Sequence, residues 1–162
     1  MGAELRTGSQ EALWQSLVAE SEQHTGIRLD EELEAYLVFV LMRHARDATL
    51  LARVMALELF RACGELGRRR LEELRDVGDR CLLLSGWYPA QALRRRVARD
   101  YFVRLGRSAY LAAAENASAA YGELFSRLAV GFARLVRVLA GVRQSQSLPR
   151  AAHWIEPASS LH

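Results

Sequence analysis

Apolar residues recur with a helical period along almost the whole 162-residue chain, and this pattern constrains the fold more than any other feature. No segment alternates in polarity over a strand's length, and no Asn-Gly or Asp-Gly hairpin turn occurs. The sequence therefore predicts an all-α antiparallel bundle of about six helices. The length and the hydrophobic content of 51% suit one domain, which we place at residues 1–143. The polar, proline-bearing residues 144–162 predict a flexible C-terminal tail.

The expected helices follow one another with short connections. Their approximate ranges are 9–23, 30–44, 47–65, 68–85, 94–115 and 118–142. Asp30 is the expected N-cap of the second helix, and the glutamates that follow it complement the positive end of the helix dipole. At the end of the fourth helix, Ser85 is the expected C-cap and Gly86 the left-handed residue. Trp87 then folds back onto the last turn near Leu82.

The longest uninterrupted apolar run covers residues 35–42, which is less than half of what a transmembrane helix requires. The N-terminus also lacks the charged-then-apolar pattern of a secretory signal, so we expect a cytoplasmic protein. Cys63 and Cys81 fall in apolar helical stretches without metal-ligand spacing. They are expected to be buried, reduced thiols.

Charge is unevenly distributed along this arginine-rich chain. All 22 basic residues are arginine, and residues 1–35 carry a net charge of −6 although the whole chain carries +3. The absence of lysine is typical of a GC-rich bacterial genome. The asymmetry indicates either an anionic partner or two ends of one fold that attract each other.

The most basic segment places arginines on the outer half of the fifth expected helix, with Val103 and Tyr110 among them. These arginines are Arg95, Arg96, Arg99, Arg104 and Arg107. The inward stripe is then Val97, Tyr101, Leu105 and Ser108. The arginines can be solvated, can pair with the acidic residues 30–34, or can bind an acidic protein or another anion. No nucleic-acid-binding motif accompanies them, so nucleic acid is the least favoured partner.

The last expected helix carries a heptad seam held over three repeats. Its members are Tyr121, Phe125, Leu128, Phe132, Leu135, Leu139 and Val142. Leu124, Val136 and Val138 lie off the seam and give the helix a second apolar surface. Either the rest of the bundle covers both surfaces, or the seam joins two copies of the chain in a homodimer.

Polar residues on apolar helix faces are candidate pocket residues. Glu58 and Arg61 are three residues apart on the third expected helix and can form an ion pair. His44 continues an apolar line on the second. No histidine has a glutamate three residues before it, so the di-iron pattern fails and we expect neither a metal nor a cofactor. No nucleophile motif or phosphate-binding loop occurs, so no catalytic residue is assigned.

A distinctive motif starts at residue 78 with GDRCLLLSGWYP and continues with RRV at 95–97, DY at 100–101, Gly106, and AY at 109–110. It resembles an uncharacterised family of small all-helical proteobacterial proteins. The resemblance covers roughly residues 76–111 and implies a helical fold and bacterial origin, but no activity. The motif also contains four side chains that can hydrogen-bond to one another. They can form either a hydrogen-bonded lock that fixes the loop or the wall of a polar pocket, and they are Asp79, Tyr88, Tyr101 and Tyr110.

Three functional hypotheses follow. The first is a non-enzymatic bundle that acts through association, as a homodimeric regulatory or adaptor protein. The second is a bundle with an interior pocket for a small molecule or lipid, lined by the second, third and fifth helices near His44, Glu58 and Tyr101. The third is an enzyme of unrecognised type.

Overall fold

The structure, a computed structural model, describes residues 2–44, 68–87 and 99–160, with side chains at 10–44, 70–87 and 100–146. These ranges contain no strand. Their helices are α1 (Gly2–Thr25), α2 (Glu31–His44), α4 (Arg68–Gly86), α6 (Arg99–Asn116), α7 (Ala119–Val130) and α8 (Phe132–Ser160). The predicted all-α bundle is therefore confirmed. The third expected helix, 47–65, lies outside the described residues.

Helix α2 begins where the sequence predicts, because Asp30 caps it. The Asp30 Oδ1 atom accepts a hydrogen bond from the Leu33 amide at 3.0 Å. That bond, and to a lesser degree the guanidinium of Arg127, holds the pKa of Asp30 below its usual value. The capping bond satisfies an amide that the first helical turn leaves without a partner.

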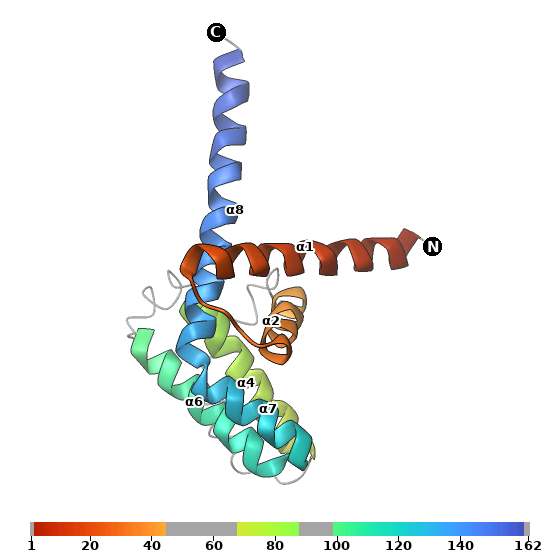
Figure 1. The fold of residues 1–162 in the computed structure, drawn as a ribbon, viewed down its shortest axis with the longest axis vertical. Helices are drawn as coiled ribbons and strands as arrows, with labels where there is room; N and C mark the ends of the chain where they lie inside the picture. The colour runs from red at the N-terminus through yellow and green to blue at the C-terminus, as the bar shows by residue number, and fades with distance from the viewer. Residues whose placement is uncertain (1, 45–67, 88–98, 161–162) are drawn as a thin grey trace.

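The helices form a bundle in which α4 packs along α6 and α8, α7 packs along α6, and α1 crosses α8 at a steep angle (Figure 1). The core draws large apolar side chains from α2, α4, α6, α7 and α8. Its largest fully buried members include Leu37, Leu74, Leu82, Tyr110, Leu128 and Phe132. Burial of one such side chain contributes about 1.5–3 kcal/mol.

Helices α1 and α8 approach closely where they cross. The Ser21 hydroxyl donates a hydrogen bond of 2.6 Å to the Val138 carbonyl oxygen. The chain then turns from α1 toward α2 at Gly26, whose φ of 71° is a left-handed conformation that favours glycine. Cys81, in α4, is buried, as the sequence predicts, and Cys63 lies outside the described residues.

The predicted role of Gly86 is wrong. Gly86 is the last residue of α4, with a φ outside the left-handed region, and the Trp87 amide donates a regular helical bond of 2.7 Å to the Leu83 carbonyl. The glycine is required by packing, since a Cβ at position 86 would lie 2.8 Å from Leu139 Cβ. Trp87 packs edge-to-face against Trp14 of α1, with ring centroids 5.7 Å apart.

The last expected helix is two helices, α7 and α8, which meet at Gly131. This residue has φ −89° and ψ 9°, outside the helical region. Hydrogen bonds from the Gly131 amide to the Arg127 carbonyl and from the Leu135 amide to the Gly131 carbonyl bridge the junction. The apolar spacing therefore continues across the break, which is why periodicity does not reveal it.

The heptad seam is used inside the chain. Six of its seven members, from Phe125 to Val142, are buried, and only Tyr121 at the start is exposed. Leu139 packs against Gly86 of α4, Phe132 packs against Gly106 of α6, and Phe125 stacks on Tyr110 of α6. The seam is consequently not a free surface for a second copy of the chain.

Helix α8 continues to Ser160, whereas the sequence analysis ends it near residue 142 and expects a tail at 144–162. The polarity of residues after Arg143 predicts solvent exposure, and solvent exposure does not prevent helix formation. Figure 1 shows this part of α8 extending away from the other labelled helices. None of the described helices has an apolar stretch long enough to cross a bilayer.

Candidate functional site

A buried carboxylate lies where α2, α4 and α6 meet. Asp79 of α4 is fully buried, and its Oδ1 atom accepts two hydrogen bonds of 2.7 Å. One donor is the hydroxyl of Tyr36 on α2 and the other is the hydroxyl of Tyr110 on α6. Three helices that are distant in sequence are therefore joined through one oxygen atom.

The residue before Asp79 makes this arrangement possible. A Cβ at Gly78 would lie 2.5 Å from Cε1 of Tyr110, so only glycine lets the ring lie flat against α4. The same ring stacks on Phe125 with centroids 6.2 Å apart and meets Tyr36 edge-to-face, also at 6.2 Å. Aromatic packing thus holds both tyrosine hydroxyls in position.

Burial controls the protonation of the cluster. Loss of solvation raises the pKa of Asp79 to about 7, although the two tyrosine hydrogen bonds and the charge of Arg75 act in the opposite direction. Burial, and then the neighbouring Asp79, raises the pKa of Tyr36 and of Tyr110 above the ordinary value. Both tyrosines therefore keep their protons and act as donors.

A second carboxylate and a histidine lie beside Asp79. The Nε2 atom of His44, at the end of α2, is 3.8 Å from Asp76 Oδ1, and Arg80 Nη2 is 2.8 Å from Asp76 Oδ2. One nitrogen or oxygen atom from each of His44, Asp76 and Asp79 lies within 4.8 Å of the other two. These are the described residues that could hold a metal ion.

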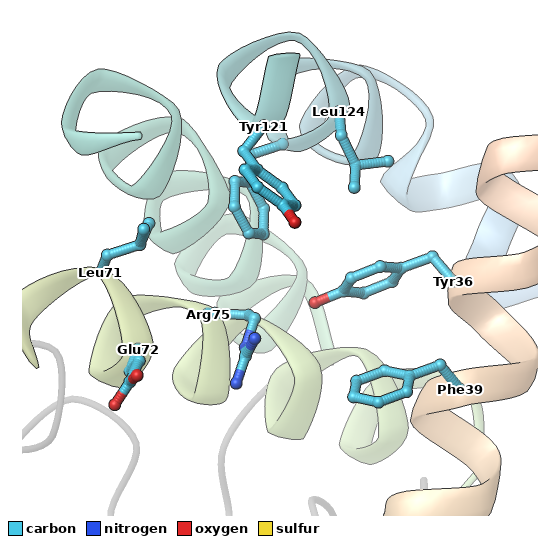
Figure 2. Close-up of a pocket in the computed structure, with 8 residues that line it drawn as sticks. Tyr36, Phe39, Leu71, Glu72, Arg75, Tyr121 and Leu124 are labelled. Atoms are coloured by element: carbon cyan, nitrogen blue, oxygen red, sulfur yellow. The ribbon is translucent and has the colours of Figure 1, made fainter. Parts of the chain in front are cut away.

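A pocket of about 410 Å³ opens between α2, α4 and α7. It is lined by Tyr36, Phe39, Leu71, Glu72, Arg75, Tyr121, Leu124 and Phe125. Figure 2 shows Tyr36 and Phe39 reaching from α2 toward α4, with Arg75 on the facing side and Tyr121 above. Phe39 is 43% exposed and Tyr121 is 60% exposed, so they form the rim.

Arg75 supplies the positive charge of this pocket. Its Nε atom is buried and has no hydrogen-bond partner within the described part of the chain. Glu72, one helical turn earlier on α4, also lines the pocket. The pocket therefore combines aromatic and aliphatic walls with one cation whose hydrogen-bonding capacity is not fully used.

The structure brings together some of the predicted site residues. Asp79 and Tyr110 are hydrogen-bonded, and His44 is buried beside Asp76. Tyr101 is half-buried, packs against Phe102, and does not line the pocket. The remaining three lie outside the described residues: Glu58, Arg61 and Tyr88.

No motif or helical pattern described above points to Tyr36, Asp76 or Arg75 as site residues. A signal for Tyr36 exists, because it is the only residue in the apolar run 35–42 whose side chain can donate a hydrogen bond. Asp76 and Asp79 are three residues apart, which places them on one face of α4. The expected pocket near His44, Glu58 and Tyr101 includes the third expected helix, which lies outside the described residues, and it stays a prediction; neither His44 nor Tyr101 lines the pocket described above.

The basic face of α6 differs from the prediction. Arg104 and Arg107 are exposed, but Tyr110 is fully buried and Ser108 is exposed, so the buried face is rotated from the predicted stripe. Phe102 and Ala109 form that face together with Tyr110. Arg95 and Arg96 lie outside the described residues, as does the side chain of Arg99.

The acidic residues at the start of α2 pair with α7. Arg127 Nη1 is 3.0 Å from Glu32 Oε2, and Arg127 Nη2 also pairs with Asp30. Arg104 and Arg107 make no ion pair within the part of the chain that the structure describes. Of the alternatives for these two arginines, pairing with residues 30–34 is thus excluded by the observed contacts.

No protein-family model, curated protein or solved structure matches this chain. The resemblance to small helical proteobacterial proteins therefore stays a prediction. Function has to be inferred from the geometry of the pocket and of the buried cluster beside it.

Proposed function

We propose that the chain is a small-molecule-binding helical bundle, and that its ligand has an aromatic or aliphatic body and one anionic group. The observation that carries this proposal is the position of Arg75 in a pocket walled by Tyr36, Phe39, Tyr121 and Phe125. A volume of about 410 Å³ is in the range of small-molecule sites. No catalytic step is proposed.

The lining residues define the chemical class of the ligand. Aromatic rings favour a flat apolar body through stacking and edge contacts. The guanidinium of Arg75 favours a carboxylate or sulfonate, which it binds through charge-assisted hydrogen bonds. Glu72 adds a negative charge to the same pocket, which disfavours ligands that carry several anionic groups.

Burial of the heptad seam shifts the order of the hypotheses. A homodimer joined through the seam residues from Phe125 to Val142 would require those side chains to be accessible, and these six seam side chains are buried. The pocket hypothesis has a defined cavity in its support, so we place it first. Self-association through another face remains a separate proposal, as do a bacterial origin and a cytoplasmic location. Native mass spectrometry tests self-association by reporting the number of subunits.

The ligand proposal is tested with 8-anilinonaphthalene-1-sulfonate, a fluorescent probe with an aromatic body and one sulfonate. Saturable one-to-one binding to the folded protein is expected. Arg75→Gln should weaken binding about tenfold or more, because a charge-assisted hydrogen bond is lost. Leu124→Trp should abolish binding, because the larger side chain fills the pocket.

Two controls make the test specific. Arg107→Gln removes an exposed arginine of α6 outside the pocket and should leave the probe affinity unchanged. N-phenyl-1-naphthylamine has the same aromatic body without the sulfonate, so Arg75→Gln should change its affinity little. The proposal fails if the sulfonate probe does not bind the folded protein, or if Arg75→Gln and Leu124→Trp leave its affinity intact.

A further inference from the structure

In each of the two neighbouring carboxylates on α4, one oxygen is held by a protein donor and the other makes no hydrogen bond among the described residues. In Asp76, Oδ2 is held by Arg80 at 2.8 Å, and Oδ1 is the atom that lies 3.8 Å from His44 Nε2. In Asp79, Oδ1 accepts both tyrosine hydrogen bonds. Its Oδ2 is buried and has no hydrogen-bond partner among the described residues.

Such a division between the two oxygens of a carboxylate is typical of a metal ligand. A coordinating carboxylate binds the ion through one oxygen, while outer hydrogen bonds to the other oxygen fix its orientation. Arg80, Tyr36 and Tyr110 are positioned to supply those outer hydrogen bonds. The rigid aromatic packing around Tyr110 would then orient Asp79 as well.

We propose that His44, Asp76 and Asp79 form a binding site for a divalent first-row transition metal ion. The ligand atoms of the three residues lie within 4.8 Å of one another. Ligands bound at about 2.0–2.2 Å from one ion lie about 3–3.5 Å apart, so small side-chain rotations would bring them into coordination. One imidazole nitrogen with two carboxylate oxygens suits zinc, manganese or iron(II) rather than calcium, which prefers oxygen ligands alone.

Charge balance supports a cation at this position. Arg80 forms an ion pair with Asp76, whereas fully buried Asp79 has no ion pair in the described ranges. A buried carboxylate is stabilised by a paired cation or a bound metal. The side chain of Asp76 is 27% exposed and lines a surface depression of about 290 Å³, which gives an ion a route to the cluster.

The test uses the purified full chain, freed of metal with a chelator and titrated with Co²⁺. The visible absorption of the ion reports its ligands. One Co²⁺ per chain is expected, displaceable by Zn²⁺. His44→Gln, Asp76→Asn and Asp79→Asn should each weaken binding more than about 100-fold, because loss of a direct ligand exceeds the effect of an outer partner. Tyr36→Phe removes an outer partner and should weaken binding about tenfold.

Matched controls use exposed residues of the same types. His24→Gln on α1 and Asp100→Asn on α6 should leave the Co²⁺ affinity and spectrum unchanged. If Asp79→Asn does not fold, Asp76→Asn carries the test, because Asp76 lies at the edge of the cluster. The site is disproved if no Co²⁺ binds, or if binding persists in Asp76→Asn or follows His24.

This site shares Tyr36 with the pocket proposed above, as an outer partner of Asp79, but none of its three ligands lines that pocket, so the two proposals can fail separately. Metal binding without probe binding would support the metal site and reject the proposed ligand pocket. Probe binding without metal binding would support the ligand pocket and reject the metal site.

Discussion

The two sides of α4 differ in how they are built. The side toward α6 and α8 is sealed: Gly78 and Gly86 admit Tyr110 and Leu139 at close range. The side toward α2 holds ionisable groups instead, with Asp79 bonded to Tyr36 and the other charged residues nearby. One helix thus carries both close apolar packing and a cluster of buried polar side chains.

This difference between apolar and ionisable side chains indicates which side of α4 serves function rather than stability alone. Apolar packing stabilises a fold without any functional requirement, whereas a buried carboxylate is retained at a cost in solvation. The pocket and the proposed metal site both lie on the polar side. Substitutions on the two sides should therefore affect different measurements, and the following predictions test that separation.

The largest effect is expected from Leu135→Arg, which places a charge in the sealed interior. Leu135 is fully buried in α8, so the substitution should destabilise the fold by more than about 4 kcal/mol. Because small domains are stable by only about 5–15 kcal/mol, the far-UV circular dichroism should show loss of helix. The exposed residue Ala133 on the same helix provides the control, and Ala133→Arg should remain folded.

A folded Leu135→Arg variant would contradict this prediction. Retained helicity with a change from dimer to monomer in native mass spectrometry would return the heptad seam to an intermolecular role.

On the polar side, stability should depend on pH through Asp79. Its pKa in the folded protein is raised to about 7 from 3.8, so protonation favours the folded state. This contribution is complete at pH values below about 4 and is lost as the pH rises through about 7. In chelator-treated protein, the loss between pH 4 and 8 should reach at most about 4 kcal/mol.

Urea unfolding of the wild-type protein and of Asp79→Asn at several pH values measures this contribution, as the difference between their free energies of unfolding. Asparagine keeps an oxygen acceptor for the tyrosines but does not titrate, so the wild-type protein should lose stability relative to the variant as the pH rises. Parallel pH profiles would show that the buried carboxylate does not titrate in this range.

The sequence predicts the sealed side of the molecule better than the polar side. Helix α2 starts at its predicted N-cap because capping by Asp30 is local, and the helix itself has no carbonyl that can pair with that amide. The spacing from Leu128 to Leu139 likewise predicts a buried stripe, because the interior selects apolar residues at helical intervals. Both signals extend over a few turns and require no knowledge of the partner helix.

The remaining features depend on contacts that no local pattern records. Tyr36 and Asp79 are 43 residues apart, and nothing near either residue indicates the other. Gly86 has the spacing of a helix C-cap, but its glycine is required by Leu139 of α8. The break at Gly131 is hidden because a single non-helical residue preserves the heptad spacing. The buried face of α6 differs from the predicted stripe for a similar reason, because the Tyr110 hydroxyl is buried where it donates to Asp79 of α4.

A smaller effect is expected where the two sides of α4 meet. In Gly78→Ala, the added Cβ would overlap the Tyr110 ring, which must move to accommodate it. The cost should be about 1–3 kcal/mol, measured by urea unfolding. Because Tyr110 also donates to Asp79, the variant should perturb Co²⁺ binding as well as stability.

Tyr110→Phe separates these two consequences, because it removes the hydroxyl and keeps the ring in place. If Gly78→Ala lowers stability and leaves the Co²⁺ spectrum unchanged, the two sides of α4 are less coupled than the shared ring implies.

The smallest effect is expected at the surface between α2 and α7, away from α4, where Arg127 pairs with Asp30 and Glu32. The side chains of Arg127 and Asp30 are 38% and 41% exposed, so solvent screens the pair. Arg127→Gln should therefore change the free energy of unfolding by only about 0–1 kcal/mol, and less in 1 M salt. Urea unfolding at low and high salt measures both values, and Arg107→Gln, which has no described partner, should change neither. A loss well above 1 kcal/mol would mean that charge pairing contributes to holding α2 against α7. Polar contacts of α2 would then stabilise the fold as well.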